Sequence, residues 1–179
     1  MVVPDDSHLV PVTVLTGFLG SGKTTLLVKL IAVLSDRGLT VSTVKHAHHS
    51  FDIDRPGKDS HRHRMAGAQQ VMVASGQRWA LMHELRGADE PAMADLIARL
   101  DPADLVLVEG FKHAAHAKLE VHRPALGKPL LQPQDRQIRA VASDQSLAGL
   151  SVPCLDLNDV AAIAAFIVDD QGLDKVATG

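Results

Sequence analysis

The spacing of hydrophobic residues changes along the chain and predicts alternating strands and helices. Residues 12–16 (VTVLT) are mostly β-branched and predict a short strand. Over 23–36 the apolar residues recur at intervals of three and four, which predicts an amphipathic helix with Gly38 as its C-terminal cap. Residues 39–46 predict the next strand, so the N-terminal third of the chain reads as a βαβ unit.

The alternation continues to the C-terminus. Apolar or alternating runs predict further strands at 70–75, 79–85, 103–110, 118–123, 138–143 and 152–157. The segment 123–137 is rich in proline and polar residues and is expected to be a loop, either an inert one or a lid. Strands that alternate with helices favour an α/β fold, with a mostly parallel sheet and helices on both faces.

Three more helices are expected after the first one, at 59–68, 90–100 and about 158–168. Asp59 or Ser60 can cap the first of them, and Asn158 can cap the last. A proline in the first turn suits the start of the middle one.

Bulk composition limits the class of protein. The chain has 179 residues, of which 46% are hydrophobic, which is enough for one ordinary core, and we expect a single domain over 1–179. A net charge of -3 gives no footprint for nucleic acid or an anionic membrane. There is neither a membrane-length apolar run nor a signal-peptide pattern, so a soluble, cytoplasmic protein is expected. The single cysteine, Cys154, excludes an intramolecular disulfide and is expected to be a small core residue on a strand.

The strongest chemical signal is the phosphate loop, residues 17–24 (GFLGSGKT), which satisfies G-x-x-x-x-G-K-[ST] between a predicted strand and a predicted helix. Its glycines let backbone N–H groups surround an anion, and the helix N-terminus adds partial positive charge. Lys23 is expected to reach the β- and γ-phosphates, and Thr24 to coordinate Mg²⁺. The loop therefore predicts a bound nucleoside triphosphate.

An acidic partner for the metal is expected at the end of a neighbouring strand. Glu109 closes the buried run 103–110, whereas Asp104 begins it and so lies at the opposite edge of the sheet. Glutamate is a departure from the more common aspartate at this place, and a solvated strand-end residue is the alternative interpretation.

The segment 45–68 (KHAHHSFDIDRPGKDSHRHRMAGA) is rich in histidine and charge and directly follows the second predicted strand. Three interpretations stay open. It is a metal site built on His46, His48 and His49; a solvated polar loop; or a switch-like segment that contacts the γ-phosphate and a second anionic ligand. In the last case the cations Lys45, Lys58, Arg62 and Arg64 pair phosphates, and the acids Asp52, Asp54 or Asp59 hold water or Mg²⁺.

Four stretches together resemble the molybdopterin-guanine dinucleotide biosynthesis protein B family over roughly residues 10 to 168: GSGKTTLL, the segment 45–68, VMVASGQRWALMHEL and DLVLVEGFK. The resemblance implies a homodimeric P-loop NTPase that binds GTP with Mg²⁺ and hydrolyses it slowly at best. It also implies association with the guanylyltransferase that joins GMP to molybdopterin, and it leaves open whether molybdopterin itself binds.

The resemblance also implies site residues. The resemblance implies that Glu109 lies in the metal region and that the phosphates are bound by Gly20, Ser21, Gly22, Lys23, Thr24 and Thr25. The phosphate-loop motif itself adds Gly17 to the phosphate site and Thr24 to the metal site. The adjoining pocket falls to Lys45, His46, Asp59, Arg62 and Arg78.

Two other functions compete with the adapter. The phosphate loop also resembles that of the cobalamin-synthesis W family of GTP-dependent metal chaperones, but those carry a cysteine-rich motif and this chain has one cysteine. A small-molecule kinase is the second alternative, with Asp59 as the catalytic base beside Lys23. Slow turnover is expected because the sequence offers no evident water-positioning glutamine and no internal arginine finger.

Recognition of the base is the least defined part of the site. The chain has no N-K-x-D motif of the kind that guanine-specific GTPases use. Asp144, Asp156 and Asn158 follow late strands and can accept hydrogen bonds from guanine, although turn and cap roles explain them equally well. The preference for guanine therefore rests on the family resemblance.

Overall fold

The computed structural model describes residues 10–47 and 51–173. The chain forms two compact units: one comprises Met1–His46 and Met93–Gly179, and the other Ala47–Ala92. The single domain expected over 1–179 stays a prediction. His48 and His49, two of the expected metal ligands, lie outside the described residues.

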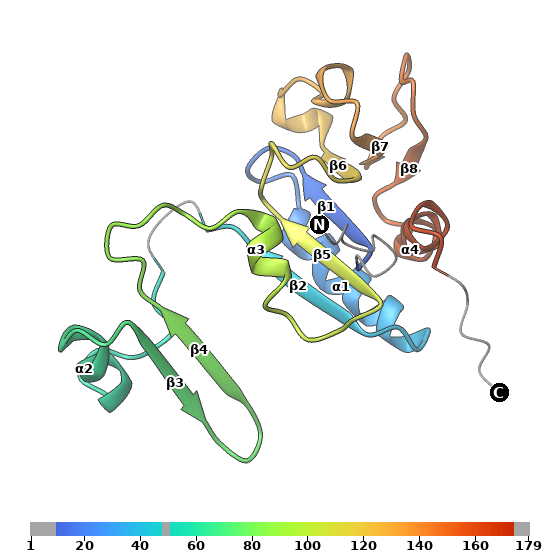
Figure 1. Cartoon of the computed structure of the whole chain (residues 1–179). Coiled ribbons are helices and arrows are strands. Elements are labelled where there is room, and N and C mark those ends of the chain that lie inside the picture. Colours follow the sequence, from blue (N-terminus) through green and yellow to red (C-terminus); the bar gives the residue numbers. More distant parts are fainter. Residues whose placement is uncertain (1–9, 48–50, 174–179) are drawn as a thin grey trace, which may run out of the picture. The chain divides into compact units, whose positions relative to one another are not determined.

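The first unit is built on a six-stranded sheet in the order β2-β5-β1-β6-β7-β8, and every neighbouring pair of strands is parallel (Figure 1). The strands are β1 (Val12–Thr16), β2 (Val41–Lys45), β5 (Leu105–Glu109), β6 (Lys118–His122), β7 (Ile138–Ser143) and β8 (Cys154–Asp156). Central strands β1 and β5 are buried along their whole length, as expected when both faces of a parallel sheet are covered.

Helices cover both faces, as the sequence predicts. On one face α1 (Lys23–Asp36) and α4 (Val160–Asp170) pack together over a leucine-rich core cluster. On the other face Met93 of α3 (Met93–Ile97) packs against Val106 and neighbouring valines. The helix α3 is shorter than the 90–100 expected, because the chain continues from it as single turns such as the one in which Leu100 N–H donates to Ile97 O (3.0 Å).

Strand β6 separates an apolar core face from a polar one. The polar face carries three buried side chains, Lys118, Glu120 and His122. The Glu120 carboxylate accepts hydrogen bonds from the backbone N–H groups of Leu131 (2.9 Å) and Gln132 (2.8 Å). These bonds fix the expected loop 123–137, which contains two 3-10 turns, η2 (Pro124–Leu126) and η3 (Gln132–Gln134).

Gly38 ends α1 as predicted. Its φ of +84° lies in the left-handed region, its N–H donates to Ser35 O (2.9 Å), and Leu39 N–H donates to Leu34 O (3.2 Å). This pair of bonds is the Schellman motif, which satisfies carbonyls that the helix itself leaves unpaired.

Asn158 does not cap α4, contrary to the sequence prediction. Asp159 is the N-cap, and its carboxylate accepts from Ala162 N–H at 2.9 Å. The backbone N–H and the side-chain amide of Asn158 instead both donate to Asp156 Oδ1 (2.8 and 3.1 Å). Asn158 and Asp159 are adjacent and either can cap a helix, but the Asn158 side chain is already used in the turn with Asp156.

Cys154 lies on a strand as expected but is exposed rather than part of the core. The physical reason is that β8 is the edge strand of the sheet, and its residues alternate between exposed and half-buried.

The second unit consists of α2 (Asp59–Met65) and an antiparallel hairpin of β3 (Gln70–Ala74) and β4 (Trp79–His83). Both strands are where the sequence predicts them, but they form their own two-stranded sheet instead of joining the parallel one. The helix has Lys58 at its N-cap position and no side-chain cap, so neither Asp59 nor Ser60 plays the capping role expected of it. Within the described ranges, no helix is both long and apolar enough to span a bilayer.

Candidate functional site

The candidate site lies at the carboxyl edge of the parallel sheet, where ligands of α/β proteins bind. The register pairs Leu15 with Glu109 and Lys45 with Glu109, so the ends of β1, β5 and β2 lie side by side. On the other side of β1, Thr16 pairs with Glu120, which brings the end of β6 to the same edge. The phosphate loop leaves β1 between these two groups of residues.

The glycines of the loop meet the requirements of its tight path. Gly17 has φ +137°, and a Cβ there would lie 2.4 Å from the carbonyl oxygen of Val121 on β6. Gly20 and Gly22 also have positive φ, +82° and +99°. Gly22 is the N-cap of α1, and the first turn of that helix receives no side-chain cap and contains no acidic residue. Uncapped N–H groups at the start of a 14-residue helix are a ready site for phosphate.

Ser21 and Lys23 complete the loop. The Ser21 hydroxyl is buried and has no hydrogen-bond partner among the described residues, as expected of a donor that a phosphate would satisfy. Lys23 Nζ donates to the carbonyl oxygens of Gly17 (3.0 Å) and Phe18 (2.9 Å), so its ammonium lies over the loop. Burial lowers the pKa of Lys23 below its ordinary value, an effect that the Glu109 carboxylate opposes and the Lys112 charge adds to. A phosphate at the loop would favour the charged form.

The two expected metal-binding residues are in direct contact. Thr24 Oγ1 donates to Glu109 Oε1 at 2.7 Å, across 85 positions of sequence. The other oxygen, Glu109 Oε2, is buried without a hydrogen-bond partner in the described part of the chain, and Lys45 Nζ lies 3.7 Å from it. A hydroxyl and a carboxylate are hard oxygen ligands of the kind that Mg²⁺ prefers. These residues fit a magnesium site beside the loop.

His46 is held at the same edge. The backbone N–H of His46 donates to the backbone carbonyl oxygen of Glu109 (2.9 Å), and the His46 ring centroid lies 4.8 Å from that of Phe111. Between them Gly110 has φ +102°, and a Cβ there would lie 2.7 Å from His46 Cβ. Only glycine lets the chain leave β5 this close to His46.

Arg123 is a site residue that the sequence reasoning missed. It follows β6 at the carboxyl edge, and its Nε donates to the carbonyl oxygen of Ser21 in the phosphate loop (3.0 Å). Its Nη1 donates to Asp144 Oδ2 at 2.6 Å, which ties the loop to the end of β7. Its position at the end of a predicted strand of the parallel sheet could have pointed to Arg123, although this residue belongs to no recognised sequence motif.

The other expected pocket residues belong to the second unit. Asp59 is the exposed first residue of α2, Arg62 is exposed on the same helix, and Arg78 closes the β3–β4 turn, where its carbonyl accepts from Ser75 N–H (2.9 Å). The structure brings together Lys23, Thr24, Glu109, Lys45 and His46. The roles expected of Asp59, Arg62 and Arg78 stay predictions.

Arg64, one of the cations expected to pair phosphates, is occupied by carboxylates of its own unit. It binds Asp52 (2.9 Å), the buried Asp54 (2.7 Å) and Glu84 (3.3 Å). It therefore holds the segment before α2 and the end of β4 against the helix. Among the described residues, no group of three or more histidine, cysteine or acidic side chains is placed to hold a metal ion.

Known proteins resemble this chain in sequence and in fold. The family model for molybdopterin guanine dinucleotide synthesis protein B matches residues 12–144. The chain is 46% identical over 164 residues to the molybdopterin-guanine dinucleotide biosynthesis adapter protein of Escherichia coli (strain K12), covering 90% of this chain and 93% of that one. The adapter protein of Haemophilus influenzae is 42% identical over 164 residues, covering 90% and 89%.

A solved structure agrees with the sequence relatives. The crystal structure of a molybdopterin-guanine biosynthesis protein B superposes with a TM-score of 0.69 at 28% identity, and the match covers 88% of this chain and 98% of that one. The P-loop NTPase fold and the family resemblance predicted from the sequence are both confirmed. The chain belongs to the molybdopterin guanine dinucleotide synthesis protein B family.

Proposed function

We propose that this chain is a GTP-binding adapter of molybdenum-cofactor biosynthesis. It holds GTP with Mg²⁺, hydrolyses the nucleotide slowly at most, and assists the guanylyltransferase that attaches GMP to molybdopterin. The observation that carries the proposal is the carboxyl edge of the sheet, where Thr24 donates to Glu109 directly beside Lys23 and the uncapped start of α1. The Escherichia coli and Haemophilus influenzae relatives are named as adapter proteins of molybdopterin-guanine dinucleotide biosynthesis, which supports this biological context.

The residues divide the work by chemical type. The backbone N–H groups of 20–25 and the Ser21 hydroxyl bind the phosphates, and Lys23 exchanges the carbonyls of Gly17 and Phe18 for phosphoryl oxygens. Thr24 and Glu109 would hold Mg²⁺, which would supply charge that neutralises the phosphates. Lys45 balances the negative charge of Glu109 from the neighbouring strand.

Slow turnover is expected because the guanidinium of Arg123, beside the loop, is already bound to protein groups. Arginine fingers accelerate GTP hydrolysis strongly by stabilising charge on the transferred phosphoryl group. The guanidinium of Arg123 is instead bound to the Ser21 carbonyl and the Asp144 carboxylate.

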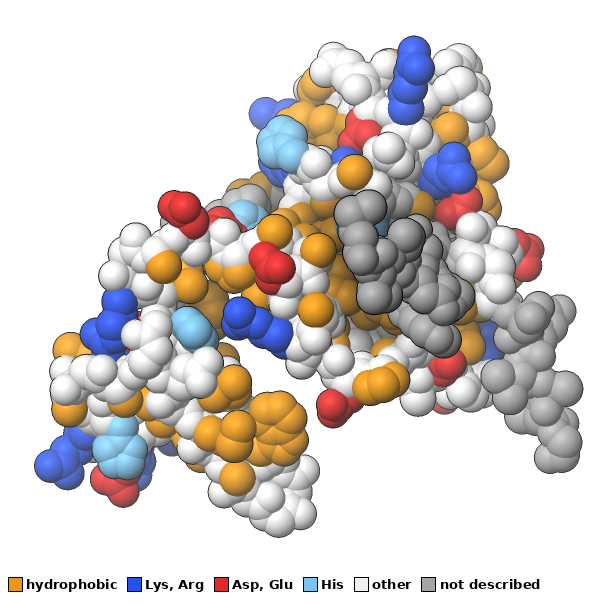
Figure 2. Space-filling view, in the orientation of Figure 1, with side chains coloured by type: hydrophobic (Ala, Val, Ile, Leu, Met, Phe, Trp, Pro, Cys, Tyr) orange, Lys and Arg blue, Asp and Glu red, His pale blue; other side chains and the backbone are white. Residues whose placement is uncertain are grey.

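A homodimer is part of the proposal. Three large side chains on one face of the hairpin are exposed, Met72 (62%), Trp79 (61%) and Leu81 (42%). Met72 and Leu81 are directly opposite each other in the β3–β4 pairing, and Figure 2 shows hydrophobic side chains gathered over the hairpin. A two-stranded sheet is marginal by itself and gains stability from a cover over its apolar face. A second copy of the hairpin supplies such a cover.

The adapter function is tested by the release of phosphate from GTP and from ATP, with the purified chain alone and with the guanylyltransferase present. The chain alone is expected to bind GTP tightly and to release phosphate from it slowly. It is also expected to bind the guanylyltransferase directly. Rapid turnover with a free small substrate would contradict the adapter and favour a kinase. A cytoplasmic location and direct contact with molybdopterin stay predictions.

The dimer is tested by sedimentation equilibrium. Wild type is expected to be dimeric, and Met72→Thr with Leu81→Thr to shift the equilibrium toward monomer. Val28→Thr is the matched control, because Val28 is also 62% exposed but lies on α1. A dimer that survives the hairpin substitutions unchanged places the interface elsewhere.

A further inference from the structure

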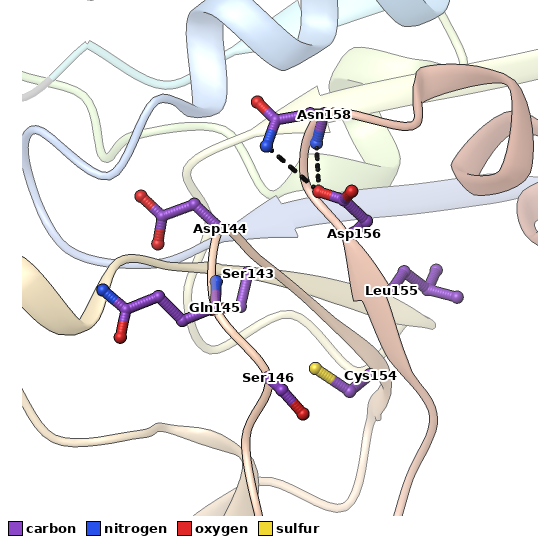
Figure 3. A pocket seen from close by; sticks show the side chains of 8 residues that line it. All are labelled: Ser143, Asp144, Gln145, Ser146, Cys154, Leu155, Asp156 and Asn158. Atoms are coloured by element: carbon purple, nitrogen blue, oxygen red, sulfur yellow. Dashed lines mark hydrogen bonds between the residues drawn. The ribbon is translucent and has the colours of Figure 1, made fainter.

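A cavity of about 350 Å³ lies at the carboxyl ends of β7 and β8, in the first unit. It is lined by Ser143, Asp144, Gln145, Ser146, Cys154, Leu155, Asp156 and Asn158. Figure 3 shows Asp156 and Asn158 at one end of it and Ser146 and Cys154 at the other. Its volume is in the range of small-molecule sites, ~300–1,000 Å³.

The cavity is joined to the phosphate loop through one side chain. Arg123 donates to Ser21 O in the loop and to Asp144 Oδ2 on the cavity wall. In the strand order, β5 with Glu109 is on one side of β1, and β6, β7 and β8 are on the other. The cavity at β7 and β8 therefore lies on the side of β1 away from Glu109.

Two carboxylates of the cavity each keep one oxygen for a ligand. Asp144 Oδ2 is bound by Arg123, whereas Oδ1 is buried and accepts no hydrogen bond from the residues described. An unsatisfied buried carboxylate oxygen is costly and calls for a partner. At Asp156 both bonds from Asn158 go to Oδ1, which orients the carboxylate and leaves Oδ2 as an acceptor.

We propose that this cavity is the base pocket and that Asp144 and Asp156 select guanine; the inference rests on the proposed function of the phosphate loop. Guanine presents adjacent N1–H and N2–H₂ donors, which match two carboxylate acceptors. Adenine places its N1 acceptor at the corresponding position, where it meets a carboxylate with no proton between them. A site built of acceptors rejects a base that lacks the donors. The pocket thus supplies the selectivity for which the sequence has no N-K-x-D motif.

The test measures the affinities of the full-length chain for GTP, ITP, ATP and inorganic tripolyphosphate, each with Mg²⁺. ITP differs from GTP only in lacking the 2-amino group, and tripolyphosphate reports on the phosphate loop alone. Wild type is expected to bind GTP about 10- to 100-fold more tightly than ITP, the usual effect of a hydrogen bond to a charged acceptor. ATP is expected to bind more weakly still.

Asp144→Asn and Asp156→Asn are the informative variants, because each replaces a carboxylate by an amide of the same shape. Both are expected to lower GTP affinity toward that of ITP, about 10- to 100-fold. Asp156→Asn is expected to leave tripolyphosphate affinity unchanged, because Arg123 links the loop to Asp144 rather than to Asp156. XTP carries a carbonyl at C2 and is expected to gain affinity in the variants. Asp36→Asn, at the exposed end of α1, is the matched control and is expected to behave as wild type.

The outcomes separate the two proposals. If both variants keep the wild-type ratio of GTP to ITP affinity, the base-pocket inference is overturned, while binding of tripolyphosphate leaves the proposed function standing. A uniform loss for all probes in Asp156→Asn also overturns the inference, since that residue would then act on the phosphate loop. If wild type binds neither GTP nor tripolyphosphate, the proposed function itself fails.

Discussion

Replacement of Gly17 by alanine adds one carbon at the most crowded point of the phosphate loop. The new Cβ would lie 2.4 Å from the Val121 carbonyl oxygen and 3.0 Å from Ser21 Oγ. The first of these atoms belongs to the backbone of β6, a strand paired on both sides, so it cannot move aside without disturbing the sheet. The backbone itself has φ +137°, a conformation that alanine rarely adopts.

Two costs combine in this variant. A non-glycine residue held in a glycine-only backbone conformation costs about 1–3 kcal/mol. Forcing an atom into a packed site costs about 1–3 kcal/mol more. We therefore expect Gly17→Ala to lower the free energy of unfolding by roughly 2–6 kcal/mol, a large share of the total stability of a domain.

The assay is urea denaturation followed by far-ultraviolet circular dichroism, which reports on the sheet and helices of the first unit. Gly38→Ala is the control, because Gly38 also has positive φ (+84°) but a Cβ there meets nothing within 4 Å. It carries only the conformational cost, about 1–2 kcal/mol. A loss for Gly17→Ala no larger than that for Gly38→Ala would refute the claim that the loop is packed against β6.

Three other substitutions test separate parts of the account. Asp135→Asn removes the negative charge that lies 2.6 Å from the buried ammonium of Lys118. It is expected to lower the free energy of unfolding in urea by about 2–4 kcal/mol. Burial alone would raise the pKa of Asp135, but hydrogen bonds from Lys118 and Gln137 bring the pKa below its ordinary 3.8. Wild type therefore loses this stability as the pH falls below that value, whereas Asp135→Asn shows no such loss. Arg64→Met leaves the buried Asp54 carboxylate without its cation and is expected to speed proteolysis within 47–92, with Arg64→Lys intermediate; equal rates for all three chains would count against this role. Glu109→Gln is expected to weaken Mg²⁺-dependent GTP binding about 10-fold in a magnesium titration, and an unchanged magnesium midpoint would remove Glu109 from the metal site.

Local signals predicted the phosphate-binding half of the site. The strand β1, the loop and α1 are contiguous, and each carries its own pattern, so the helix Lys23–Asp36 is found at the bounds expected for it. Glu109 could be named because parallel strands end at one edge, and its bond to Thr24 follows from that topology. The helix caps were harder, because neighbouring polar residues such as Asn158 and Asp159 differ only in where the turn directs them.

The rest of the site depends on contacts between distant residues. Arg123 reaches the loop from 102 positions away, and the choice of β6 as the neighbour of β1 creates that contact. The hairpin strands lie where an apolar run and an alternating run predict them, but such patterns do not show which strands are neighbours, and these two pair with each other. The buried Glu120 is likewise invisible to a pattern that assigns charge to the surface, because the N–H groups that satisfy it lie in a loop.

The central claim, that the loop 17–24 holds GTP with Mg²⁺, is tested most directly by calorimetric titration of the wild-type chain and of Lys23→Ala. Wild type is expected to bind one GTP per chain. Lys23→Ala is expected to lose about 100-fold or more in affinity, because it removes the cation that reaches the phosphates, with an unfolding curve close to that of wild type. Lys29→Ala, on the exposed side of the same helix, is the control and is expected to bind as wild type does. Wild-type GTP affinity in the Lys23→Ala chain would contradict the account.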